Sequence, residues 1–420
     1  MKLRRVVVTG LGAVSPIGND VPTLWENAVN GVSGAGPITR FDSYLFKTQF
    51  ACEVKGWDPT SCMDRREVRK VDVHTQFGVA AAVEAINDSG LQFEQEDCNR
   101  IGVIYGEGVG GLIALEDEVC EYALNKENGP RFSPFLIPKI ITDITSGVIS
   151  IRYGLKGPNY ATTSACASST NAIIEAYDQI RLGRADVVVA GGSEAAICQL
   201  GVGGFNSMHA LSARNDDPQG ASRPFSKSRD GFVVGEGAAS LILEEYEHAV
   251  GRGAKIYAEI VGTGLTADAY HITLPHPDGD GAYRVMKAVL DEAGLSPEDV
   301  DYINVHGTST PAGDIVEAKA IKNLFGEHAY KMNISSTKSM TGHLLGAAGA
   351  LEALLTVLAV KNDIVPPTIN HAEDDEDPNI DYGMNFTFNK AQKRTVNVAI
   401  SNTFGFGGHN ASIAFKKFEG

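Results

Sequence analysis

The chain has 420 residues, of which 43% are hydrophobic and 21% are charged, and its formal net charge is −16. This composition is typical of a globular protein with a large core, and the length suggests two or three domains. The negative charge argues against general nucleic-acid binding, because the phosphates would be repelled, although an acidic partner could still bind a local basic patch.

Strand and helix patterns alternate along the chain. Continuous apolar and β-branched runs predict strands at residues 5–10, 100–105, 185–190, 240–244, 255–261, 300–305 and 396–401. Apolar residues at helical spacing predict helices at residues 73–87, 167–182, 282–293, 317–325 and 345–360. No low-complexity linker separates the two halves, which share the same βα character. The sequence therefore predicts an α/β protein made of two closely packed, layered halves.

The hydropathy pattern indicates neither export nor membrane insertion. The basic N-terminus and the apolar run after it imitate a signal peptide, but Thr9, Gly10 and Gly12 interrupt the run. The apolar stretch 344–360 contains Glu352 and is short for a bilayer, so we expect a helix buried on all sides. Six widely spaced cysteines without a CxxC pair predict reduced thiols in the cytoplasm, rather than a zinc knuckle or a disulfide scaffold.

Cys166 stands where an extended segment turns into a helix. A thiol at such a junction meets the positive end of the helix dipole and a row of free backbone N–H groups. Both favour the nucleophilic thiolate, so we expect the pKa to fall below its usual value of about 8.5. The alternative is a small buried cysteine that only packs as a hydrophobe.

A glycine-rich segment follows the strand predicted at residues 100–105. Gly106 to Gly111 matches the G-x-G-x-x-G pattern of dinucleotide sites, but no acidic residue ends a second strand at the required distance. We therefore expect no nucleotide cofactor. The glycines are instead interpreted as allowing close backbone approach around a pocket.

Three segments in the second half carry polar residues next to strands. His306 follows one predicted strand, His343 precedes the Gly/Ala-rich helix, and residues 401–410 form a glycine-rich turn after the last strand. Taken singly, each histidine is more often a hydrogen-bonded core residue than a catalyst. The two histidines are too far apart in sequence for a zinc motif, so we expect no metal site.

Together with Cys166, these segments resemble the β-ketoacyl-acyl carrier protein synthases of the thiolase-like superfamily. The resemblance covers essentially the whole chain and extends to residues 8–12, 222–225 and 229–237. One cysteine with two histidines is similar to the elongating synthases of type II. The resemblance implies a thiolase-like fold in α-β-α-β-α layers, with residues 1–251 carrying the nucleophile and residues 252–420 carrying both histidines.

The resemblance also implies a decarboxylative Claisen condensation without metal or organic cofactor. Cys166 would take an acyl chain from a carrier thioester. The backbone N–H groups of Cys166 and Phe404 would form the oxyanion hole. His306 and His343 would stabilise the enolate that malonyl thioester leaves when it loses CO2. Phe404 would also gate the acyl chain.

Further roles follow from the same resemblance. Lys338 would support the second histidine, and Glu317 would be the buried glutamate that pairs with this lysine. Val109, beside Gly108, would narrow the acyl pocket. Phe135 would contribute to the pocket near the interface of a homodimer. The alternative for Lys338 is a surface lysine, and the alternative for Glu317 is an acid that caps a helix.

The partner implied by the resemblance is an acyl carrier protein that delivers phosphopantetheine thioesters, including malonyl thioester. The densest basic run of this acidic chain would be its docking patch: Arg65, Arg66, Arg69 and Lys70. The alternative is a solvated helix face.

Some features depart from the family pattern and leave the acyl chain length open. These are Ser226 to Ser228, Ala167 to Ser169, and Glu107 beside the pocket glycines. Two rival enzymes remain: an acyltransferase or thiolase that uses coenzyme A thioesters, and a ketosynthase subunit of a polyketide or aryl-polyene pathway. A non-enzymatic scaffold is disfavoured, because the nucleophile, the lysine and both histidines are all present.

Overall fold

The computed structural model describes residues 3–419. The strands of its main sheet are β1 (Val6–Val14), β4 (Ile101–Gly106), β5 (Asn159–Thr162), β6 (Val187–Glu194), β7 (Gly237–Glu245), β8 (Ala258–Ala267), β9 (Tyr302–Asn304), β10 (Asn333–Ser335), β13 (Val398–Gly405) and β14 (His409–Lys417). Two small sheets pair β2 (Gly36–Pro37) with β3 (Phe50–Ala51), and β11 (Ile364–Val365) with β12 (Gln392–Lys393).

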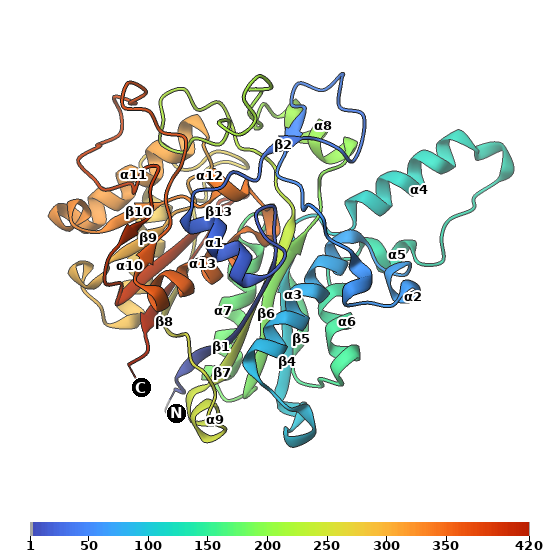
Figure 1. Ribbon diagram of the computed structural model, residues 1–420, viewed down its shortest axis with the longest axis horizontal. Coiled ribbons are helices and arrows are strands. Elements are labelled where there is room, and N and C mark those ends of the chain that lie inside the picture. The colour runs from blue at the N-terminus through green and yellow to red at the C-terminus, as the bar shows by residue number, and fades with distance from the viewer. Residues whose placement is uncertain (1–2, 420) are drawn as a thin grey trace.

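The helices alternate with these strands (Figure 1). They are α1 (Val21–Val29), α2 (Arg65–Val68), α3 (Val73–Ser89), α4 (Leu112–Leu124), α5 (Leu136–Ile140), α6 (Ile144–Tyr153), α7 (Ser168–Arg181), α8 (Gln199–Ser207), α9 (Tyr246–Gly251), α10 (Asp280–Ala293), α11 (Pro311–Phe325), α12 (Lys338–Thr341) and α13 (Ala348–Asn362).

The main sheet contains two halves with the same strand order and directions. Its order is β10-β9-β13-β14-β8-β1-β7-β6-β4-β5. In each half three parallel strands are followed by two antiparallel ones: β5, β4 and β6 correspond to β10, β9 and β13. The halves join where β1 pairs with β8, antiparallel, with Val6 opposite Ile260. The division at residue 251 lies just after α9 and stays a prediction.

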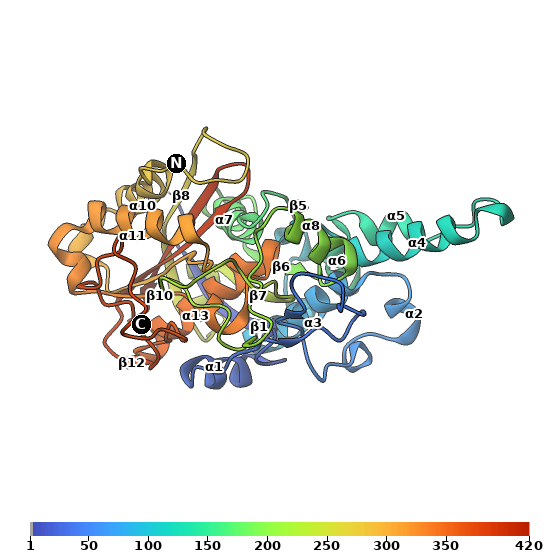
Figure 2. The ribbon, with the colours of Figure 1, turned by 90° about the horizontal axis from the view of Figure 1, so that it is seen from above.

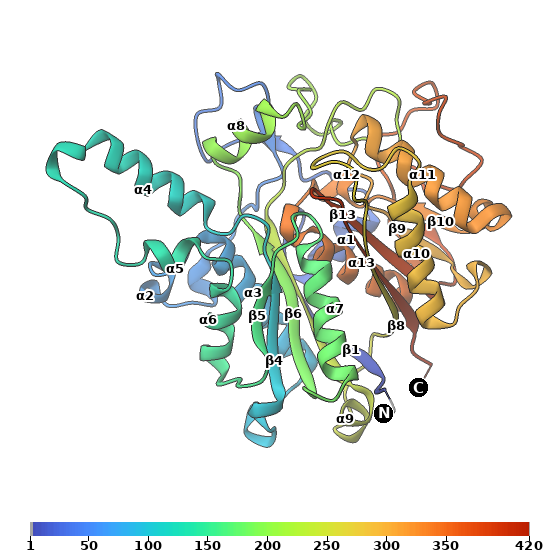
Figure 3. The same cartoon turned by 180° about the vertical axis from the view of Figure 1, so that it is seen from behind.

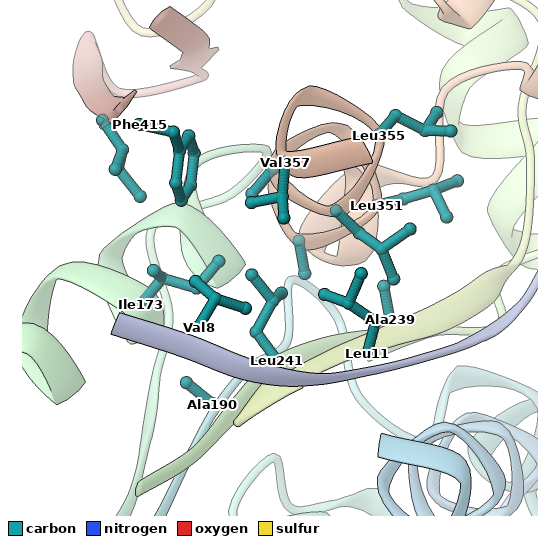
Figure 4. Close-up of a cluster of buried hydrophobic side chains, with 14 of the residues drawn as sticks. Val8, Leu11, Ile173, Ala190, Ala239, Leu241, Leu351, Leu355, Val357 and Phe415 are labelled. Carbon is teal, nitrogen blue, oxygen red and sulfur yellow. The ribbon is translucent and has the colours of Figure 1, made fainter. Parts of the chain in front are cut away.

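The helices form three layers around the two halves of the sheet. α7 and α13 lie between the halves, α3 and α6 cover the outer side of the first half, and α10 and α11 cover the outer side of the second (Figures 2 and 3). The central core packs apolar side chains of α7 and α13 against β1 and β7, as Figure 4 shows for Ile173, Leu351, Leu241 and Val8. The α/β layering predicted from the sequence is confirmed.

The stretch predicted to be a fully buried helix is α13 with the short turn before it. By length and composition alone, residues 345–362 could cross a membrane, but 89% of that window is buried inside the protein. The helix packs against strands of both halves, including β7 and β13. It is therefore a core helix, as the sequence predicts.

Most predicted elements are confirmed with shifted ends. α3 begins after the N-cap Asp72 and closes at Gly90, whose φ of 69° is the left-handed C-cap that glycine favours. α11 begins earlier than predicted, at Pro311, because proline suits the first helical turn. β8 begins and ends later than predicted, at Ala258 and Ala267.

Several elements escaped the sequence patterns, and the largest is an arm formed by residues 112–140. α4 and α5 make up this arm, which projects from the body of the protein (Figure 2). Its apolar side chains are not confined to one buried face, so the sequence shows no clear apolar stripe that would predict these two helices. β14 was also missed, although its residues are buried almost throughout.

Candidate active site

The residues singled out in the sequence meet at the carboxyl ends of the parallel strands, where ligands of open α/β sheets bind. Cys166 follows β5, His306 follows β9, His343 follows β10 and α12, and Phe404 lies at the end of β13. All four line one cavity of about 540 Å³. The repeated topology of the two halves therefore brings the nucleophile and both histidines to one place.

Cys166 sits on a sharp turn between β5 and α7. Ala165 has a φ of 51°, a left-handed conformation that is uncommon for a residue with a side chain. The hydroxyl of Ser168 braces the turn, since it donates to the Ala165 carbonyl at 2.6 Å and accepts from the Ser164 N–H at 2.9 Å. Strain held in place by its surroundings is typical of functional sites, and here it points the thiol into the cavity.

The expected low pKa of Cys166 is wrong for the free thiol in this structure. Burial raises the pKa of the thiol to about 12, and it outweighs the opposing effects of the Lys338 charge and of the Phe406 backbone N–H. The sequence argument counted the helix dipole but not the removal of water, which penalises the charged form of any buried group. The resting nucleophile is therefore a thiol that must be deprotonated as it reacts.

His343 touches the nucleophile. Its Nε2 lies 3.0 Å from Cys166 Sγ, and the backbone N–H of Leu345 donates to its Nδ1 at 3.3 Å. A backbone donor at Nδ1 assigns the proton of the neutral ring to Nε2. Burial and the Lys338 charge hold the pKa of His343 well below its ordinary value. His343 is therefore a neutral donor aimed at the reacting sulfur.

His306 faces the same space from the other half of the sheet. Its ring centroid lies 5.4 Å from that of His343 and 5.7 Å from that of Phe404. Burial, followed by the Lys338 and His343 charges, holds its pKa well below the ordinary value. The lowered pKa keeps the imidazole neutral at pH 7, and its Nδ1 is buried without a hydrogen-bond partner among the described residues.

Glu317 positions the His306 loop rather than pairing with Lys338. Its carboxylate accepts the backbone N–H of His306 at 2.9 Å and that of Gly307 at 2.8 Å. The predicted partner of Lys338 is therefore wrong: the ammonium forms an ion pair with Glu352 of α13, and both side chains are almost fully buried. Glu352 is the one acidic residue in an apolar helix, a signal that could have identified it.

Lys338 acts on the site by its charge. It lowers the pKa of Cys166, His306 and His343, although burial dominates in each case. Glu352 compensates the buried ammonium, and burial nevertheless raises the pKa of this carboxyl to about 7. A buried cation in this position favours thiolate over thiol and disfavours imidazolium.

Two of the three residues predicted for the acyl pocket line the cavity of the single chain, and their role toward an acyl chain stays a prediction. Gly108 and Val109 line the cavity, whereas Phe135 lies in the arm and is not among the lining residues. Glu194, which the sequence did not reveal, accepts the N–H groups of Gly108 at 2.8 Å, Val109 at 3.3 Å and Gly346 at 3.0 Å. This carboxylate joins the pocket wall to the segment after His343.

The predicted docking patch forms the short helix α2 and the residues after it. Arg65, Arg66, Arg69 and Lys70 are all exposed. Asp64 caps the helix together with Glu67, which reaches back to the N-cap backbone. The patch is thus an ordered basic surface rather than a loose loop.

The side chains of Cys166, His306 and His343 are close enough together to surround a metal ion. The ligand atoms of Cys166, His306 and His343 lie within 4.8 Å of one another. The donor set suits a metal poorly, because the Leu345 N–H leaves the proton on the His343 nitrogen that faces the sulfur. The positive charge of Lys338 further opposes a cation there.

Comparison with known proteins assigns the family. Residues 3–249 match the family described as beta-ketoacyl synthase, N-terminal domain, and residues 257–372 match beta-ketoacyl synthase, C-terminal domain. A curated relative from Synechocystis sp., named 3-oxoacyl-[acyl-carrier-protein] synthase 2, is 50% identical over 420 residues, covering 100% of this chain and 99% of that protein. A relative of the same name from Staphylococcus aureus is 49% identical over 416 residues, 99% of each chain.

Comparison with solved structures gives the same family. A beta-ketoacyl synthase from Burkholderia phymatum has a TM-score of 0.90 and 34% identity, covering 99% of this chain and 100% of that one. A ketosynthase solved with its type II polyketide acyl-carrier protein has a TM-score of 0.87, also at 34% identity, with 99% and 100% coverage. The thiolase-like fold and the resemblance seen in the sequence are confirmed, and the chain belongs to the β-ketoacyl synthase family.

Proposed function

We propose that this protein is an elongating condensing enzyme of fatty acid synthesis. It moves an acyl chain from an acyl carrier protein to Cys166 and joins it to malonyl-acyl carrier protein, giving CO2 and 3-oxoacyl-acyl carrier protein. Full-length relatives named 3-oxoacyl-[acyl-carrier-protein] synthase 2 support this reaction. The single observation that carries it is the 3.0 Å contact between His343 Nε2 and Cys166 Sγ in a cavity shared with His306.

Acylation uses the sulfur as a nucleophile. The Cys166 sulfur attacks the carrier thioester, a new carbon–sulfur bond forms, and the bond to the phosphopantetheine sulfur breaks. The thiol proton passes to the departing carrier sulfur. Lys338 and the Phe406 N–H favour the thiolate as it forms, against the cost of burial. The backbone N–H groups of Cys166 and Phe404 hold the transient oxyanion.

Condensation uses the two imidazoles as donors. Malonyl thioester loses CO2, and the electron pair of the broken carbon–carbon bond enters an enolate. His306 and His343 donate N–H groups to the enolate oxygen, which a neutral ring can do and which the nearby Lys338 charge reinforces. The carbanion attacks the acyl carbonyl, a carbon–carbon bond forms, and Cys166 leaves as thiolate and takes one proton from solvent. The thioester stabilises the enolate, so neither metal nor cofactor is needed.

The carrier protein docks on the basic patch of α2. An acyl carrier protein is the partner named for one solved relative, a ketosynthase in complex with it. The exposed arginines and Lys70 attract an acidic carrier locally, although the enzyme as a whole carries a net charge of −16. Local steering of this kind raises the rate of encounter more than the final affinity.

A second copy of the chain covers the arm. Its apolar side chains are exposed to an extent unusual for a monomer: Val119 51%, Leu124 80%, Phe132 46%, Phe135 37% and Ile137 61%. In a homodimer these side chains are buried, and Phe135 reaches the acyl pocket of the neighbouring copy. Light scattering after gel filtration tests this arrangement, and a monomer at micromolar concentration would contradict it. The free cysteines fit a reducing, cytoplasmic setting.

Intact-mass spectrometry after mixing with acyl carrier thioesters tests the reaction. We expect an acyl adduct on the wild-type chain and none on Cys166→Ala, followed by loss of the adduct when malonyl-acyl carrier protein is added. Turnover with coenzyme A thioesters alone would favour the acyltransferase alternative. A requirement for a second, different chain would favour a ketosynthase subunit like that of the ishigamide ketosynthase/chain length factor, which is 34% identical.

A further inference from the structure

A buried ionic cluster lies behind the acyl-pocket wall and has no part in the reaction described above. His74, in the first turn of α3, contacts two carboxylates: its Nδ1 lies 3.2 Å from Asp72 Oδ1 and its Nε2 lies 3.1 Å from Glu107 Oε2. His74 and Glu107 are 0% exposed and Asp72 is 4% exposed. Three titratable groups buried this deeply are costly unless they compensate one another.

The cluster places one histidine between two carboxylates, and hydroxyl groups donate further hydrogen bonds to Glu107. Burial alone would lower the pKa of His74, but Glu107 and Asp72 outweigh it and raise that pKa to about 10, so the ring is an imidazolium at neutral pH. Ser193 donates to Glu107 Oε1 at 3.1 Å, and Thr145 donates to the same oxygen. The Thr75 hydroxyl lies 3.1 Å from Nε2 of His74, the same ring nitrogen that faces Glu107.

The cluster holds both ends of one segment. Glu107 directly follows β4 and begins residues 107–114, the segment that carries Gly108 and Val109 into the cavity wall. At the other end of the segment, the backbone N–H of Ala114 in the first turn of α4 donates to Asp72 Oδ2 at 2.8 Å. α3 and the base of α4 lie side by side in Figures 1 and 3. His74 lies between the two carboxylates and ties them together.

The middle of the segment is held from the opposite side. Glu194 accepts the N–H groups of Gly108 and Val109, as described above, and a side chain on Gly108 would lie 2.5 Å from its Oε2. The wall therefore has a fixed backbone, and its one exposed side chain at the cavity is Val109, 42% exposed. An acyl chain that reached Val109 would meet this fixed backbone.

We propose that the buried Asp72–His74–Glu107 triad is a positioning device that fixes the acyl-pocket wall and thereby limits the length of the acyl chain that Cys166 accepts. This inference rests on the proposed function, because it takes Cys166 as the acyl carrier. The three residues do not touch the reacting atoms. They act through Val109, because they set the free energy that a long acyl chain would need to displace residues 107–114.

An ionic triad is suited to this purpose in a way that an apolar cluster is not. Buried ion pairs with satisfied hydrogen bonds add little net stability but specify one geometry, because every displaced charge loses its partner. Apolar side chains would let the wall slide at small cost. Neutralising the triad is therefore expected to change selectivity for chain length more than it changes the reaction itself.

The test compares acylation of Cys166 by short (butyryl) and long (palmitoyl) acyl carrier thioesters, followed by intact mass. The decisive variant is the double substitution His74→Phe with Glu107→Gln, which removes one positive and one negative charge at similar volume and so leaves no added charge imbalance. A milder variant, Ser193→Ala, removes one donor to Glu107 and keeps the ion pair. The matched control is His248→Phe, which removes another His–Glu contact, to Glu244, far from the cavity.

We expect the double variant to raise the long-to-short acylation ratio by about fivefold, with the butyryl rate close to that of wild type. Ser193→Ala is expected to move the ratio in the same direction by a smaller factor. His248→Phe is expected to leave the ratio unchanged even if it lowers the melting temperature. This split between selectivity and short-chain rate is one that a merely structural role would not produce.

Two results would overturn the proposal. One is a ratio in the double variant equal to that of wild type and of His248→Phe. The other is an equal loss of both rates, which would give the triad a purely structural role, and failure of both test variants to fold would count the same way. Absence of any adduct on the wild-type chain would instead overturn the proposed function, so the two failures are distinguishable.

Discussion

Cys166 Sγ and His343 Nε2 lie 3.0 Å apart, although 177 residues separate them in the chain. The contact joins the turn after β5 to the segment after α12, which occupy equivalent places in the two halves of the sheet. Because Leu345 donates to the other ring nitrogen, His343 presents N–H rather than a lone pair. The pair is therefore built to stabilise negative charge on a reacting group, not to accept a proton permanently.

Replacement of His343 should slow the decarboxylation of malonyl-acyl carrier protein while leaving the acylation of Cys166 in place. We expect His343→Ala to lower the rate of CO2 release from malonyl-acyl carrier protein by about 10²- to 10³-fold, the usual cost of one lost donor to a developing oxyanion. Acylation of Cys166 should persist, since its nucleophile remains. The control is His328→Ala, because that ring bonds the Val300 carbonyl outside the cavity. Equal loss of both half-reactions would contradict the assigned role.

The Lys338–Glu352 pair should be important to stability as well as to activity. Glu352→Gln leaves a buried ammonium without a counter-charge, and we expect the free energy of unfolding to fall by about 3–5 kcal/mol. The double variant Lys338→Met with Glu352→Met should recover much of this stability but no activity. Urea titrations monitored by circular dichroism measure the difference. A single variant as stable as wild type would show that Lys338 has another partner.

Charge reversal on α2 should affect carrier recognition alone. Arg65→Glu with Arg69→Glu is expected to raise the apparent KM for acyl carrier substrates several-fold, by removing local attraction between exposed charges. The kcat should stay close to that of wild type. The effect should shrink as salt is added, because screening weakens exposed charges. Lys416→Glu, an exposed basic residue near the C-terminus of the chain, is the matched control. Unchanged kinetics with carrier substrates would refute the docking patch.

His248 should make stability depend on pH. Its Nδ1 lies 2.6 Å from Glu244 and its Nε2 lies 2.9 Å from Glu96, and these carboxylates raise its pKa from 6.5 to about 9. A histidine whose pKa is raised by folding stabilises the fold fully below its unfolded pKa, and this contribution is lost as pH rises through about 9. The stability gap between wild type and His248→Phe should therefore narrow between neutral pH and about pH 9.5. A constant gap would contradict the ion pairs.

Local pattern was sufficient to predict the main elements that carry the site. The runs of β-branched residues marked β4, β6, β9 and β13, and helical spacing marked α3 and α7, because both signals depend only on neighbours within a few residues. Elements without such a signal escaped, above all α4, whose exposed apolar side chains break the expected stripe. Their placement depends on contacts distant in sequence.

What the sequence determined by itself is a set of reactive side chains: a cysteine at a strand-to-helix turn, a histidine after a strand, a lysine and a second histidine before a Gly/Ala-rich helix, and a glycine-rich segment beside a pocket. What only the tertiary structure decided is which charges meet. Lys338 pairs with Glu352 rather than Glu317, burial raises rather than lowers the pKa of the Cys166 thiol, and His74 joins Asp72 to Glu107. Ion pairing and desolvation depend on every neighbour in space, and periodicity along a chain carries no record of them.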